Sequence, residues 1–153
     1  MRRKEWDRRG LEGLPLKLLL VALLISTSLP VVASSIDSYR SAVGEAGMGV
    51  EISRLASSIS EVYAAGEGNV RMITLELPMG QDSRIEIGGD GIEAMSVRGF
   101  AAGRSVRTEY LDDPPIRVIV DGDTMVIGEG TNTIRLECIQ ADGRLVVKAE
   151  AST

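Results

Sequence analysis

The residues that could carry chemistry in this chain are carboxylates. Asp112 and Asp113 form a pair, and Asp121 and Asp123 follow a few residues later. Paired carboxylates can act as general acid and base, and oxygen ligands suffice for Ca²⁺, for which Glu129 is a third candidate. Each group also fits a turn, because the first pair precedes two prolines and Asp121 precedes a glycine. We therefore expect turns here, with no catalytic or metal site.

Other reaction centres are missing from the composition. The sequence contains no histidine, which removes Ser-His-Asp and Cys-His nucleophiles, the usual zinc sites and the commonest general base. The single cysteine, Cys138, stands in an alternating apolar pattern that favours a buried free thiol. The glycine-rich stretches 66–69 and 128–132 lack the features of a phosphate-binding loop. We expect a protein that is not an enzyme and needs no cofactor.

An alternating strand pattern fills the chain after residue 69. Short strands separated by glycine, proline and aspartate turns indicate an antiparallel β-sandwich or barrel. Asp121-Gly122 and Asp142-Gly143 are the strongest hairpin signals, because this dipeptide accepts the positive φ angles of a tight turn. The predicted strands are 70–77, 84–87, 92–98, 105–110, 116–120, 124–127, 133–139 and 144–149.

The predicted core is aliphatic. Aromatic residues are scarce, with one Trp, one Phe and three Tyr, so β-branched and leucine side chains must fill a domain of this size. The core candidates from the last four strands are Val118, Val120, Val126, Ile134, Leu136, Cys138, Leu145 and Val147.

Residues 34–65 keep a helical period but carry two apolar stripes. The stripes are offset by two residues, about 200° around a helix, so a straight helix cannot bury both on one side. The offset coincides with Gly44, Gly47 and Gly49, where we expect a bend or a break. Gly66 predicts the end of the helix. The first stripe is Ile36, Tyr39, Val43, Ala46 and Val50, and the second is Met48, Ile52, Leu55, Ile59 and Val62.

Residues 14–33 form an apolar segment of membrane-spanning length. Nineteen of these twenty residues are uncharged, and a hydrocarbon layer of about 30 Å needs a helix of this length. The exception, Lys17, is near enough to the basic end for its side chain to reach the interface. Residues 1–33 carry a net charge of +3 and the remainder −8. A basic flank normally stays in the cytoplasm, so we expect a single-pass membrane protein with an extracytoplasmic acidic domain. The negative charge of this domain also argues against nucleic-acid binding.

The predicted fold is therefore α+β, with an N-terminal transmembrane helix and an amphipathic helix followed by an antiparallel β-sandwich-like domain. Four segments follow: a basic cytoplasmic leader at 1–13, a transmembrane or signal-anchor helix at 14–33, a glycine-interrupted amphipathic helix at 34–65, and an extracytoplasmic β domain at 66–153. One alternative stays open. Val31 and Ala33 are small residues at the −3 and −1 positions of a signal-peptidase site, behind a helix-breaking Pro30.

This layout resembles archaeal type IV pilin-like proteins. The resemblance rests on Arg8-Arg9-Gly10 and Glu12-Gly13 ahead of the apolar run, the helical stripes and the strand-rich tail. It implies that a dedicated peptidase cuts after Gly10 or Gly13, and that the retained helices pack in a filament or hold the domain at the cell surface. Where the bacterial pattern has Glu at the fifth mature position, this chain has Pro15 or Leu18.

Three functions remain after these exclusions. The first is a pilin-like surface protein whose helices anchor it in the membrane and mediate self-association or assembly with other pilin-like subunits. The second is a monomeric membrane-tethered β domain that binds a ligand or partner through an exposed patch, for which Phe100, Tyr110 and Met95 are the candidates. The third is a secreted soluble protein released by cleavage after Ala33.

Overall fold

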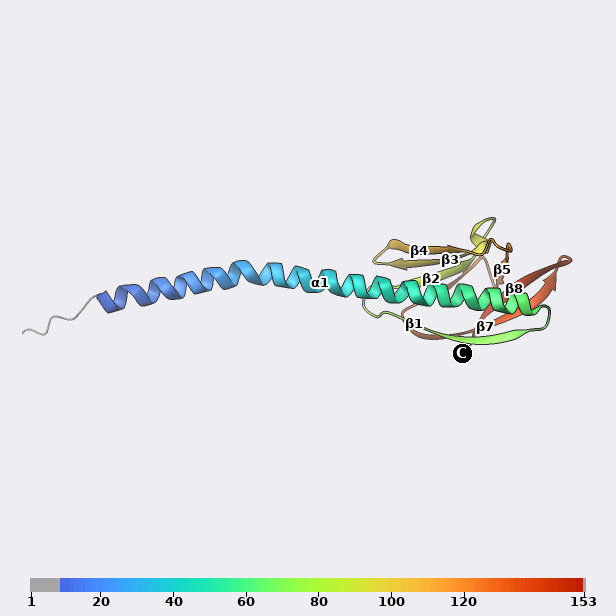
Figure 1. Cartoon of the computed structure of the whole chain (residues 1–153), viewed down its shortest axis with the longest axis horizontal. Helices are drawn as coiled ribbons and strands as arrows, with labels where there is room; N and C mark the ends of the chain where they lie inside the picture. Colours follow the sequence, from blue (N-terminus) through green and yellow to red (C-terminus); the bar gives the residue numbers. More distant parts are fainter. Residues whose placement is uncertain (1–8, 153) are drawn as a thin grey trace, which may run out of the picture. The chain divides into compact units, whose positions relative to one another are not determined.

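The computed structural model describes the backbone of residues 9–152 and the side chains of residues 16–152. It divides into two units, one ending at Arg40 and one beginning at Ser41 (Figure 1). The predicted leader lies largely outside the described residues.

The α+β fold class is confirmed: a long apolar N-terminal helix precedes two mostly antiparallel sheets. The helix is α1 (Arg9–Ala65). The strands are β1 (Val70–Leu77), β2 (Arg84–Gly88), β3 (Ser96–Ala101), β4 (Arg104–Tyr110), β5 (Val118–Val120), β6 (Thr124–Ile127), β7 (Gly130–Ala141) and β8 (Arg144–Ser152), and the short 3-10 helix η1 (Glu93–Met95) precedes β3. The predicted strand 92–98 therefore begins later than expected, because η1 takes up its first half.

In the first unit, α1 continues through Pro30 without the break that the sequence suggested. The hydroxyl groups of the polar residues in this segment form hydrogen bonds within the helix. Thr27 and Ser28 donate hydrogen bonds to the carbonyls of Leu23 and Leu24, at 3.0 and 2.7 Å. Side chains bonded back to the helix in this way expose no unpaired donor to an apolar solvent, so they are compatible with a membrane interior.

The second unit contains two four-stranded sheets, ordered β1-β7-β8-β5 and β4-β3-β2-β6. The β7–β8 hairpin turns at Asp142-Gly143 as predicted, with φ of 52° and 72° at the two residues. The hairpin predicted at Asp121-Gly122 is wrong. Strand β5 pairs in parallel with β8, whereas β6 pairs with β2, so the Asp121-Gly122 turn crosses from one sheet to the other.

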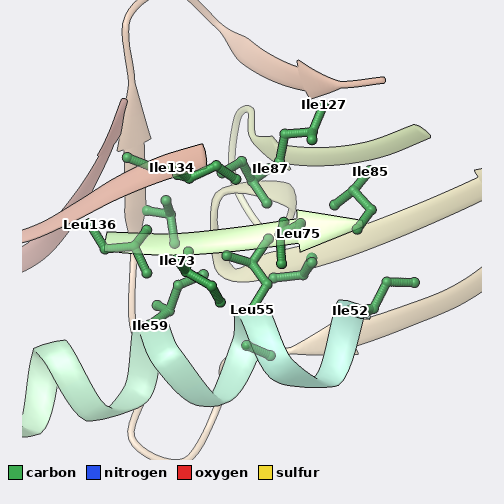
Figure 2. Close-up of a cluster of buried hydrophobic side chains, with 14 of the residues drawn as sticks. Ile52, Leu55, Ile59, Ile73, Leu75, Ile85, Ile87, Ile127, Ile134 and Leu136 are labelled. Carbon is green, nitrogen blue, oxygen red and sulfur yellow. The ribbon is translucent and has the colours of Figure 1, made fainter. Parts of the chain in front are cut away.

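The last part of α1 completes the core of this unit. Its flanks contact both facing edge strands, through an Arg71–Glu61 ion pair to β1 and a 3.1 Å hydrogen bond from Ser53 to Glu109 on β4. Its inner face carries the second predicted stripe, which is buried in full. Figure 2 shows the helix side chains directed at those of the strands, among them Ile52, Leu55, Ile59, Ile73, Leu75, Ile85, Ile87, Ile134 and Leu136.

We expected a bend or a break at the glycine cluster, and the break is absent, since α1 is continuous through Gly44, Gly47 and Gly49. The conflict between the stripes is resolved differently: one stripe is buried and the other stays exposed. Gly44 is itself buried, and a Cβ there would lie 2.3 Å from Oε1 of Gln81. Glycine at this position therefore allows close packing. The predicted end is confirmed, because α1 stops at Ala65 and Gly66 has φ of 87°.

Two of the predicted core residues are exposed. Val126 lies on β6, where its neighbour Ile127 is buried, so the alternation of this strand turns Val126 outward. Leu145 follows the β7–β8 turn at the end of the sheet and remains 38% exposed. Val120 is only partly buried. The other candidates are buried as predicted: Val118, Ile134, Leu136, Cys138 and Val147.

Candidate functional site

The paired aspartates form a surface turn. Asp112 and Pro115 form an isolated antiparallel β-bridge. The backbone N–H of Ile116 donates a 2.8 Å hydrogen bond to the carbonyl of Leu111, which closes the turn. Both Asp112 and Asp113 are exposed. Exposed carboxylates in water have neither the desolvation nor the fixed partner that tunes a catalytic acid.

The three calcium-ligand candidates are not gathered into one site. Asp121 lies 3.9 Å from Nζ of Lys148, and Asp123 lies in the turn before β6. Glu129 accepts hydrogen bonds from the backbone N–H groups of Gly80, Gln81 and Ser83, at 3.0, 2.8 and 3.2 Å. Among the residues that the structure describes, no three His, Cys, Asp or Glu side chains gather as a metal site would require.

The hydrogen bonds to Glu129 give this residue a structural role that the sequence did not indicate. The N–H of Gly80 first, and then those of Ser83 and Gln81, lower the pKa of the Glu129 carboxyl. The carboxylate holds the β1–β2 loop against the β6–β7 connection. Since its partners lie far back in the sequence, no local pattern could have indicated this contact.

Cys138 is a buried free thiol, as predicted. Burial is the main cause that raises the pKa of its thiol. A neutral, enclosed thiol is a poor nucleophile and a poor metal ligand.

The three residues predicted as a binding patch, Met95, Phe100 and Tyr110, lie apart in the structure. Met95 and Tyr110 lie at one end of the β3–β4 pair, where Tyr110 pairs with Ser96 and is 55% exposed. Phe100 lies further along β3 and is partly covered by the guanidinium of Arg84, 4.7 Å from the ring centre. These three side chains do not form one patch.

The first unit presents a largely apolar surface from Leu16 to Val32. The large apolar side chains from Leu16 to Val32 are exposed by half or more, with Leu18 at 67% and Leu24 at 61%. α1 contains a stretch long and apolar enough to cross a membrane, and none of that stretch is buried within the protein. A membrane anchor and a signal sequence both have this character.

The first stripe is also exposed. Ile36 and Tyr39, in the first unit, are 47% and 71% exposed, and Val43 and Val50, in the second, are 53% and 64% exposed. In the second unit a shallow groove of about 410 Å³ runs beside Ala46 and Val50 and is closed on its other side by β4. Apolar residues left uncovered at helical spacing offer a surface for another helix.

The candidate processing residues all fall within α1. Gly10 and Gly13 belong to its first turns, but their surroundings lie outside the residues whose side chains are described. Ala33 is an exposed helical residue.

Neither the comparison with protein-family models, nor that with curated proteins, nor that with solved structures found a match for this chain.

Proposed function

We propose that the protein is a non-enzymatic, membrane-anchored, archaeal type IV pilin-like surface protein. In this proposal residues 14–33 lie in the cell membrane with the leader in the cytoplasm, and the acidic β domain is presented outside. The distribution of charge supports this orientation, since the leader side is basic and the remainder is acidic.

One observation carries the proposal: a single helix supplies both the membrane-length apolar surface and the core of the β domain. The exposed stretch from Leu16 to Val32 and the buried stripe from Met48 to Val62 belong to the same α1. A helix shared in this way couples the anchor covalently to the folded domain, with no intervening linker described by the structure. An anchor that merely tethered a finished domain would not need to enter its core.

The exposed first stripe supports self-association as the second part of the proposal. Ile36, Tyr39, Val43, Ala46 and Val50 recur at three- and four-residue intervals, the spacing of a helix–helix seam. The surface offered by these side chains has no partner within the described chain. A second copy that brings the same stripe would cover it.

The mature N-terminus tests the anchoring part. We expect N-terminal sequencing of the membrane fraction to begin at Leu11 or Leu14, after cleavage at Gly10 or Gly13. An intact leader on a membrane-bound chain would favour the monomeric tether instead. A soluble product that begins at Ser34 would refute the anchor and favour secretion after Ala33.

Cysteine cross-linking tests the assembly part. In membranes, Val43→Cys should form disulfide-linked dimers under mild oxidation, because Val43 lies on the exposed stripe. Ser41→Cys is the matched control: it is exposed too, but lies two residues away and so about 200° around the helix. The natural Cys138 is buried and stays unreactive. Equal cross-linking at both positions, or none at Val43, would refute assembly through this stripe.

A further inference from the structure

A groove of about 1080 Å³ lies where α1 ends, within the unit that begins at Ser41. Its walls come from the last turns of α1, from η1, from β5 with the residues before it, and from the β7–β8 turn with the start of β8. Sites for small organic ligands have volumes of roughly 300–1,000 Å³ and commonly lie between elements in this way. The groove is therefore large enough for an organic molecule.

Part of the groove surface is apolar. Tyr63 comes from α1, Met95 from η1, Ile119 from β5 and Leu145 from β8. Leu145 belongs by alternation to the core but remains 38% exposed at this place. The aromatic ring and the aliphatic side chains offer a surface for the apolar body of a ligand.

The cationic part of the groove stands apart from the rest of the domain. Residues 41–153 contain ten Lys and Arg against eighteen Asp and Glu, and seven of the ten cations form ion pairs. Within the described residues, the guanidinium groups of Arg104, Arg117 and Arg144 form none. Two of these three, Arg117 and Arg144, line the groove.

The unpaired arginines mark a place for an anion. Carboxylates are abundant on this domain, yet among the described residues only Asp142 lines the groove, and no ion pair joins it to either arginine. Both arginines are exposed and retain their planar donor groups for a ligand. Two guanidinium groups against one carboxylate leave a local charge of about +1, suited to a monoanion.

We propose that this groove binds a small organic carboxylate, with the guanidinium groups of Arg117 and Arg144 on the carboxylate and the apolar side chains against the body of the ligand. This inference goes beyond anchoring and assembly, and it does not depend on them. The groove lies within the unit that begins at Ser41, so the site is the same whether the chain is a filament subunit, a solitary anchor or a released protein.

Fluorine NMR of the full-length chain in phosphatidylcholine nanodiscs tests the proposal, with 4-(trifluoromethyl)benzoate as the probe. Empty nanodiscs correct for partition of the probe into lipid. We expect a saturable shift of the fluorine resonance, and a dissociation constant raised about tenfold by each of Arg117→Gln and Arg144→Gln, since each removes a charge-assisted hydrogen-bond donor.

Arg104→Gln is the matched control. Arg104 is likewise exposed and unpaired among the described residues, but it does not line the groove, so its removal should leave probe binding unchanged. The neutral amide of the probe tests the charge, and acetate in competition tests the apolar body; both should bind at least about tenfold more weakly. Circular dichroism confirms that each variant is folded. Undiminished binding in the Arg117→Gln/Arg144→Gln double variant, equal binding of the amide or acetate, or no saturation in the wild type would overturn the proposal.

Discussion

The two parts of α1 use apolar residues in opposite ways. From Leu16 to Val32 apolar side chains cover nearly every side of the helix and are exposed. From Ile36 to Ala65 they form two stripes, of which the second is buried against the sheets and the first stays exposed. A helix that is apolar all round suits a uniform apolar solvent, whereas a one-sided stripe suits a protein core. α1 therefore combines an N-terminal part that is apolar all round and exposed with a one-sided part that joins the protein core, and the pattern changes after Val32.

Truncation of one leucine in each part tests this comparison most strongly. Leu55 is fully buried, so Leu55→Ala should lower the free energy of unfolding of the β domain by about 2–5 kcal/mol. Leu24 is 61% exposed and outside that core, so Leu24→Ala should change the same quantity by less than about 0.5 kcal/mol. Denaturation of the full-length protein in nanodiscs, followed by hydrogen exchange of the strand amides, measures both. Equal losses would contradict the division.

The next prediction concerns how closely the core part of α1 approaches the sheet. A Cβ at Gly99 on β3 would lie 2.2 Å from Cδ1 of Ile52 and 3.1 Å from Sδ of Met48. Gly99→Ala should therefore cost about 1–3 kcal/mol through overpacking. Ile52→Val removes the clashing Cδ1, so the double variant should lose less stability than the two single losses added together. Strict additivity in this double-mutant cycle would show that the helix does not press on Gly99.

A glycine that touches nothing should behave in the opposite way. Gly47 lies inside α1, and a Cβ there would meet no atom within 4 Å. Gly47→Ala should stabilise the protein by about 1 kcal/mol, the difference in helix propensity. Gly44→Ala is the matched comparison and should gain less, because the side chain of Gln81 must move away. Thermal unfolding of the two variants decides between close packing and helix weakness as the reason for each glycine.

These glycines show where sequence reasoning stopped. Helix propensity indicated a weak helix at Gly44–Gly49. Propensity depends on the local sequence alone, so it contains no information on Gln81, which packs against Gly44 from a distant loop. The same limit explains the two Asp-Gly turns. Asp142-Gly143 joins strands that pair with each other. Asp121-Gly122 instead connects strands of different sheets, since β5 pairs with β8, which comes much later in the sequence.

Several patterns with a local physical cause were read correctly. The alternation in β1 and β6 gave their bounds, the stripe from Met48 to Val62 identified the buried face, and Gly66 identified the helix end. The candidate sites were harder, because they depend on distant neighbours. The residues next to Glu129 in the sequence do not indicate which backbone amides it binds. Those next to Arg117 and Arg144 do not indicate that the two arginines line one groove.

The smallest expected effect belongs to Glu129, outside the helix. Backbone N–H groups lower the pKa of its carboxyl from the ordinary value of 4.5, so the charged form is favoured in the folded state. The resulting stability is present in full above the unfolded pKa and is lost as the pH falls through the lower folded pKa. Glu129→Gln should thus be modestly less stable than the wild type at neutral pH.

The difference between the two proteins should shrink as the pH falls below about 4.5 and vanish once the wild-type carboxyl is protonated. Denaturation at a series of pH values measures it, with Glu76→Gln, an exposed position on β1, as the control for loss of one negative charge. A Glu129→Gln deficit that persists unchanged in acid would mean that the carboxylate holds the loop by shape alone. Because the amides belong to Gly80–Ser83, loss of the charge should also raise hydrogen exchange in this loop first, while the strands around Leu75 and Leu136 keep their protection.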